Sequence, residues 1–177
     1  MRMKTFGKKL SGPVYIGIDQ SYSGFAITSL NEEGFYTTVY KSDLRGIDRL
    51  ADIRDHLRFA LEQCDIRDVA MEGYAFGSQM ANMLGELGGM VKLELRDMAR
   101  YPLIVPPTTL KKYATGKGQG VPKSQIMLQV FKKWGVEFSD DNAADSYVLA
   151  RIVAGLHTLE YEREIYEKLQ DPKFRER

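Results

Sequence analysis

Short apolar runs separated by turn-forming residues occur five times along the chain and predict five β-strands. The first three runs are separated only by the short segments QSYSG and NEEG, which have the composition of turns, so they predict an antiparallel meander. The third run, FYTTVY, is rich in the β-branched and aromatic residues that favour strands. The predicted strands are residues 14–19, 25–30, 35–40, 68–76 and 103–105.

Apolar residues spaced three and four apart predict helices between and after these strands. One amphipathic helix, at 47–64, covers a face of the sheet. The next, at 79–99, contains three glycines within residues 85–89, although a glycine inside a helix costs about 1 kcal/mol relative to alanine. Such glycines are accepted where a helix packs closely, either on its own sheet or on a partner subunit. Further helices are predicted at 108–114, 122–134 and 140–157.

This order of elements predicts an α/β fold: a mixed five-stranded sheet, made of an antiparallel three-strand meander plus two parallel strands, with helices on both faces. The length of 177 residues and the hydrophobic content of 44% suffice for one folded core. We expect a basic N-terminal arm at 1–12 and one folded domain at 13–157. A charged helix or tail at 158–177 is expected to fray after Pro172.

The formal net charge of +1 hides a strong separation of charge along the chain. Residues 1–13 hold four basic residues and no acid, and residues 98–136 hold seven basic residues and no acid. These eleven positive charges leave the remainder of the chain with a net charge of −10. Segregation of this kind suits a protein that binds a polyanion on one surface and gathers carboxylates on another, although a solvated helix face explains any single lysine.

Composition excludes several classes of protein and site. No stretch approaches the roughly 18 apolar residues of a membrane span, and the N-terminal residues lack a signal-peptide core, so we expect a cytoplasmic protein. The single cysteine, Cys64, excludes an internal disulfide and a cysteine zinc cluster, and the only histidines, His56 and His157, exclude a histidine-rich metal site. The glycine-rich segment TGKGQGVPK lacks the Walker spacing, so no nucleotide cofactor is expected.

Several carboxylates occur where a buried acid is unfavourable. Asp19 and Glu72 each end an apolar run, and ligands of open α/β sheets bind beyond strand ends. Asp145 shares the apolar face of the last predicted helix, where a carboxylate is costly unless it is paired or bound to a metal, and Asp141 lies one turn earlier on that face. If these elements meet, the all-oxygen site suits Mg²⁺ or Mn²⁺ rather than Zn²⁺.

Each acid also has a structural explanation. Asp19 alone can serve as a turn former, and Asp140, Asp141 and Asn142 are ordinary capping and first-turn residues of a helix. Glu72 and Asp145 are harder to explain in this way, because each stands among apolar residues. The metal-site interpretation therefore depends mainly on these two.

The chain contains four motifs in order, GIDQSYSG, VAMEGYAF, KSQ and DNAADSYVLA, and also the helix fragment LGELGGMV. In these motifs it resembles the RuvC-type Holliday junction resolvases, the crossover junction endodeoxyribonucleases of the ribonuclease H-like superfamily. The similarity covers about residues 13–157 and implies a ribonuclease H-like fold with two Mg²⁺ or Mn²⁺ ions per active site. It assigns the metal ligands, which are also the catalytic acids, to Asp19, Glu72 and Asp145, with Asp141 or Asn142 as the fourth.

Two positions depart from that family's pattern. The family usually spaces its last two acids three apart, and the residue three before Asp145 is Asn142. We favour Asp141 as the fourth ligand, with Asn142 as the alternative. In addition, Gln20-Ser21 stands where Pro-Gly follows the aspartate in the common bacterial form.

The resemblance implies metal-dependent hydrolysis of four-way DNA junctions by symmetric nicks that leave 5′-phosphate and 3′-hydroxyl ends. Paired nicks call for a two-fold homodimer, for which the helix at 79–99 is the candidate interface, unless it only packs on its own sheet. Lys123 matches a catalytic basic residue near the scissile phosphate. Tyr74 and Phe76 match aromatic residues that stack at the junction centre, or they belong to the core. The expected phosphate contacts are Lys111, Lys112, Lys117 and Lys123.

Other functions fit part of the pattern. A sugar kinase or Hsp70-like ATPase shares the GIDxS motif but needs a second domain that 177 residues cannot supply. A catalytically weak junction-binding protein is kept open by Asn142, although the three retained acids argue against it. A ribonuclease H-like nuclease acting on flaps, forks or RNA fits the same residues. The histidines and the cysteine are interpreted as structural.

Overall fold

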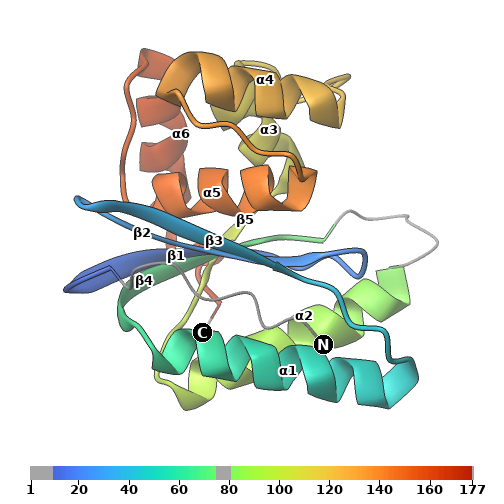
Figure 1. Cartoon of the computed structure of the whole chain (residues 1–177). Coiled ribbons are helices and arrows are strands. Elements are labelled where there is room, and N and C mark those ends of the chain that lie inside the picture. Colours follow the sequence, from blue (N-terminus) through green and yellow to red (C-terminus); the bar gives the residue numbers. More distant parts are fainter. Residues whose placement is uncertain (1–9, 75–80, 177) are drawn as a thin grey trace.

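The structure is a computed structural model that describes residues 10–74 and 81–176. A mixed five-stranded sheet forms the centre of this part of the chain (Figure 1). Its strands are β1 (Pro13–Asp19), β2 (Phe25–Asn31), β3 (Gly34–Tyr40), β4 (Asp65–Glu72) and β5 (Leu103–Val105). They lie in the order β3-β2-β1-β4-β5, with the first three of the chain antiparallel and β1, β4 and β5 parallel. The predicted fold class is confirmed.

The fourth strand differs from its predicted bounds. β4 begins at Asp65, because its first residues pair with the beginning of β1, and it ends at Glu72 rather than at 76. The N–H of Gly73 then donates to the carbonyl oxygen of Val105 at 2.8 Å, and the chain leaves the strand. Residues 75 and 76 lie outside the described ranges. Glu72 is therefore a strand-end residue, as Asp19 is in β1.

Helices α1 (Gly46–Glu62) and α2 (Ala81–Asp97) cover one face of the sheet (Figure 1). Both begin and end within two residues of their predicted bounds. They are joined by Arg58, whose Nη2 lies 2.9 Å from Oε1 of the buried Glu94. The buried apolar residues that they contribute to the core are Ile53, Leu57 and Leu61 of α1 and Leu87, Val91 and Leu95 of α2.

The opposite face of the sheet carries α3 (Pro107–Thr115), α4 (Lys123–Trp134) and α5 (Asp141–Val153), with α6 (Glu160–Leu169) beside them (Figure 1). α5 lies directly on the sheet, and every residue from Asn142 to Ala150 is buried. None of the helices within the described ranges is long and apolar enough to cross a membrane.

The predicted helix at 140–157 is wrong in its length. α5 ends at Val153, and Gly155 adopts a left-handed backbone conformation with φ of 68° that lets the chain turn away. α6 then packs on the core through Ile165 and Leu169. The charged C-terminal segment therefore contains a docked helix of its own.

The predicted fraying after Pro172 is also wrong. Both Nη atoms of Arg175 donate to the two carboxylate oxygens of Asp68, at 2.7 and 2.6 Å. The backbone of Arg175 bridges to Leu103 of β5, and Phe174 packs against the core. These contacts join the C-terminal segment to strands that are distant in sequence, so the composition of the tail does not reveal them.

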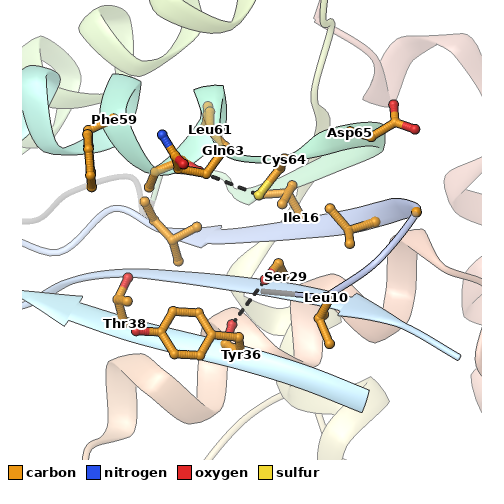
Figure 2. Close-up of a pocket in the computed structure, with 14 residues that line it drawn as sticks. Leu10, Ile16, Ser29, Tyr36, Thr38, Phe59, Leu61, Gln63, Cys64 and Asp65 are labelled. Atoms are coloured by element: carbon orange, nitrogen blue, oxygen red, sulfur yellow. Dashed lines mark hydrogen bonds between the residues drawn. The ribbon is translucent and has the colours of Figure 1, made fainter. Parts of the chain in front are cut away.

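An apolar pocket of about 270 Å³ lies between α1 and strands β1, β2 and β3 (Figure 2). Its lining includes Leu10, Gly12 and Asp65, which lie at or before the first residues of β1 and β4. Cys64 lies in this lining (Figure 2), and its Sγ donates to the Ala60 carbonyl oxygen at 3.5 Å. Asp19 and Glu72, at the other ends of these strands, are not part of the lining.

Candidate active site

Three acids meet where β1 and β4 end beneath α5. Asp19 is 5% exposed and Asp145 is 9% exposed. Burial, reinforced by the charges of Glu72 and Asp145, raises the pKa of Asp19 well above its usual range. Burial raises the pKa of Glu72 to about 7, and burial together with the charge of Glu72 raises the pKa of Asp145 to about 7. The mutual effects show that the three carboxyl groups share one site.

The donor chemistry of this cluster fits a divalent cation. The oxygens that it could offer a metal ion are all carboxylate oxygens, which Mg²⁺ and Mn²⁺ prefer. Oδ1 of Asp145 is buried and has no hydrogen-bond partner among the described residues, so it is available to a ligand. In this conformation no group of three or more acidic, histidine or cysteine side chains within the described ranges is arranged to hold a metal ion.

Two lysines bring positive charge to the acids. Lys123, the first residue of α4, forms an ion pair through Nζ with Oδ2 of Asp141. Partial burial acts to lower the pKa of Lys123, but this hydrogen bond and the charges of Asp141, Asp145 and Asp19 outweigh it and raise the pKa. The charge of Lys111, in α3, acts in the lowering direction on the pKa values of Glu72 and Asp145, but the effect of burial is larger and both remain raised. Lys111 and Lys123 thus belong to the surroundings of the acids.

The first turn of α5 assigns different tasks to its neighbouring polar residues. Asp140 is the N-cap, and its side chain accepts a hydrogen bond from the backbone N–H of Asn142 at 2.9 Å. The side-chain Nδ2 of Asn142 lies 3.1 Å from the same Oδ1 and close to Gly24 of the turn between β1 and β2. Capping therefore uses Asp140 and Asn142, and Asp141 is left to interact with Lys123 and the other acids.

A glycine outside the predicted set of site residues brings α5 close to β1. A Cβ added at Gly17 would lie 2.0 Å from the carbonyl oxygen of Ser146 and 2.5 Å from the backbone nitrogen of Ala150. Only glycine lets the helix backbone approach this closely, and Asp145 stands next to the contact. The signal in the sequence was a glycine inside a strand, which indicates close backbone approach.

Buried hydroxyl groups hold α5 in this position. Oγ1 of Thr28 in β2 lies 2.7 Å from Oγ of Ser146 and 2.7 Å from Oγ1 of Thr37 in β3. Ser146 also donates to the carbonyl oxygen of Ala143 at 2.9 Å. This chain of hydrogen bonds ties the residue after Asp145 to two strands, and the sequence pattern did not predict it.

The other basic residues of the acid-free block differ in their surroundings. Lys112 and Lys117 are exposed, near the left-handed Gly116 that ends α3. Lys133, in contrast, is half-buried against α6, where its Nζ pairs with Glu162 and donates to the carbonyl oxygen of Tyr113 at 2.9 Å. The positive charge of the block is therefore only partly available to a ligand.

Of the two predicted stacking residues, the structure describes only Tyr74. Tyr74 is half-buried against α2: a Cβ at Gly88 would lie 2.3 Å from its Oη, and Nζ of Lys92 lies 5.1 Å from its ring centroid. Phe76 lies outside the described residues. His56 stacks on Tyr40 with ring centroids 4.2 Å apart, a packing contact that suits a structural role.

Comparison with solved structures identifies the fold. The structure of RuvC from Thermus thermophilus matches with a TM-score of 0.65 and 17% identity, over 92% of this chain and 98% of that chain. The chain has the RuvC fold. T. thermophilus RuvC in complex with a Holliday junction substrate matches with a TM-score of 0.65 and 14% identity, over 93% and 99% of the two chains.

A third structure extends the likeness to a eukaryotic protein. The yeast mitochondrial Holliday junction resolvase Ydc2 matches with a TM-score of 0.50 and 18% identity, over 88% of this chain and 79% of that chain. No protein-family model and no curated protein matches the sequence. The resemblance that the motifs indicated is confirmed in three dimensions as a RuvC-type, ribonuclease H-like fold.

Proposed function

We propose that the chain is a metal-dependent endonuclease that resolves Holliday junctions and related branched DNA by symmetric hydrolysis, leaving 5′-phosphate and 3′-hydroxyl ends. The observation that carries the proposal is the meeting of the buried Asp19 and Asp145 with the half-buried Glu72 at the strand ends of a RuvC fold, with all three pKa values raised. Acids in such surroundings are characteristic of functional sites, because burial without a ligand is unfavourable.

Asp19, Glu72, Asp145 and Asp141 would hold two Mg²⁺ or Mn²⁺ ions. When bound, such ions activate a water molecule and stabilise the leaving oxygen of a phosphodiester. Two observations favour Asp141 over Asn142 as the fourth ligand. The charge of Asp141 acts on Asp19 and Asp145, whereas the amide nitrogen of Asn142 is hydrogen-bonded to Asp140.

Lys123 would contact the phosphate that is cut. Its raised pKa keeps the ammonium group protonated at neutral pH, and its Nζ already lies at the edge of the acidic cluster. Lys111, Lys112 and Lys117 lie on the same side of the sheet, on α3 and the loop that follows it, and would bind flanking phosphates. The DNA would therefore approach from the side of α3 and α4.

A homodimer formed through α2 would place two such sites on one junction. Gly88 packs inward, but a Cβ added at Gly85 or Gly89 would have no described atom within 4 Å. Met83 and Leu93 of the same helix are 44% and 61% exposed. These open and apolar positions support a helix–helix contact, and sedimentation of the wild type and of Leu93→Glu would test it.

The decisive experiment is a nicking assay on synthetic four-way junction, fork, flap and linear duplex, with Mg²⁺ or Mn²⁺. We expect preferential, paired nicking of the junction by the wild type and loss of at least about a hundredfold in Asp145→Asn. Asp97→Asn, an exposed acid at the end of α2, is the matched control and keeps full activity. Equal cutting of linear and branched DNA would contradict the assignment of junctions as the substrate. Full activity of Asp145→Asn would contradict the assignment of Asp145 to the active site.

Two further variants address the fourth ligand. Asp141→Asn is expected to lose most of the activity, while Asn142→Ala keeps the activity of folded protein and loses part of the helix cap. The reverse order of effects would assign the fourth ligand to Asn142.

A further inference from the structure

The ends of β1 and β4 are joined beyond the last pair of their backbone ladder. Regular parallel pairing of the two strands stops at Ile18 and Met71. One residue further along β4, the carbonyl oxygen of Glu72 accepts a hydrogen bond from the side-chain Nε2 of Gln20 at 2.9 Å. The Gln20 side chain thus replaces the backbone donor that β1 does not provide at this point.

The surroundings of Gln20 leave its amide one orientation. The residue is 6% exposed, and only Nε2 can donate to a carbonyl oxygen, so Oε1 must point the other way. Oε1 is buried without a hydrogen-bond partner among the described residues. A buried amide whose oxygen has no hydrogen-bond partner lowers the stability of the fold. The position of Gln20 beside two acids of the site therefore indicates a role other than stabilising the fold.

α2 is shaped to receive this side chain. A Cβ at Gly88 would lie 2.5 Å from Oε1 of Gln20 and 2.3 Å from Oη of Tyr74. Gln20 and Tyr74 therefore fill the space that a side chain at position 88 would need. Gln20 follows Asp19 directly, and Tyr74 comes two residues after Glu72, so both strand ends are packed on the same point of α2.

We propose that Gln20 is a positioning residue that fixes Glu72 relative to Asp19, with Gly88 providing the space for it. This inference rests on the proposed function, because the spacing of these two acids matters when they share a cation. Hydrogen bonding of the Glu72 carbonyl restrains the backbone from which the carboxylate projects, so Gln20 acts through Glu72 in this role.

The test replaces Gln20 by methionine, which is of similar length and cannot donate a hydrogen bond. We expect the dissociation constant for Mn²⁺, measured by isothermal titration calorimetry without DNA, to rise about three- to tenfold. The turnover rate on a saturating four-way junction should fall, while junction affinity in EDTA stays unchanged. Gln170→Met is the matched control, since its Nε2 also donates to a backbone carbonyl, that of Tyr166 at 3.1 Å, on the exposed surface of α6.

Gly88→Ala provides a second route to the same result. Its Cβ would displace Oε1 of Gln20 without removing any hydrogen-bonding group, so weaker Mn²⁺ binding is again expected, with the thermal unfolding temperature showing that the variant is folded. Unchanged Mn²⁺ affinity and turnover in folded Gln20→Met would overturn the inference, as would equal weakening in Gln170→Met. A wild type that neither binds Mn²⁺ nor nicks junctions would instead overturn the proposed function.

Discussion

Asp145→Asn is expected to stabilise the metal-free protein in a manner that depends on pH. Burial and the charge of Glu72 raise the pKa of Asp145 from 3.8 to about 7 in the folded chain. The unfolded chain has the ordinary pKa, so between these values the folded state binds more protons, and the free energy of unfolding falls as pH rises. Asparagine carries no charge and removes this dependence.

The expected magnitude follows from the two pKa values. A tenfold difference in proton affinity corresponds to about 1.4 kcal/mol, so the full effect of Asp145 is about 4 kcal/mol, of which about 2–3 kcal/mol develops between pH 5 and pH 8. The asparagine amide adds donors that need partners, at a cost of about 1–3 kcal/mol that is the same at both pH values. Comparing the two pH values cancels this constant cost.

Urea unfolding in EDTA at pH 5 and pH 8 measures the effect. The free energy of unfolding of Asp145→Asn, relative to that of the wild type, should increase by about 2–3 kcal/mol between pH 5 and pH 8. Asp97→Asn, whose side chain is 67% exposed, should gain nothing. A difference between Asp145→Asn and the wild type that is the same at both pH values would contradict the raised pKa of Asp145. Added Mg²⁺ at pH 8 should stabilise the wild type and not the variant.

Three further predictions concern stability, each measured by urea unfolding. Gly17→Ala should lose about 3 kcal/mol or more because its Cβ would lie 2.0 Å from the Ser146 carbonyl oxygen, and a loss as small as that of Gly85→Ala would contradict the close approach of α5. Lys133→Met leaves the carboxylate of Glu162 buried without its cation, so the free energy of unfolding should fall by about 3–5 kcal/mol. A fall no larger than that caused by Lys132→Met, at an exposed lysine, would mean that the ion pair does not stabilise the fold. Arg175→Ala removes the two-bond pair with Asp68 and should lose about 1–2 kcal/mol, and an unchanged midpoint would mean that the C-terminal segment is not held by it.

Local pattern predicted the elements well, because a strand or a helix face depends mainly on its own neighbours in sequence. The apolar runs that end in Asp19 and Glu72 are strands, and these strands end at those two residues. The order of the predicted elements also indicated the antiparallel meander and the parallel strands. Errors occurred where long-range contacts set the limits. β4 starts at Asp65 because β1 lies beside it, and the C-terminal segment is docked because Arg175 reaches Asp68.

The sheet, the helices and the acids at unfavourable positions could therefore be predicted from the order of residues. Which polar groups are buried, and which of them meet, became visible only in the folded chain. There Asp140 rather than Asp141 caps α5, Lys133 pairs with the buried Glu162, and Gly17 lets the segment that carries Asp145 lie on β1. This is because the energy of a charge depends on the chain segments packed around it, and these come from distant parts of the sequence.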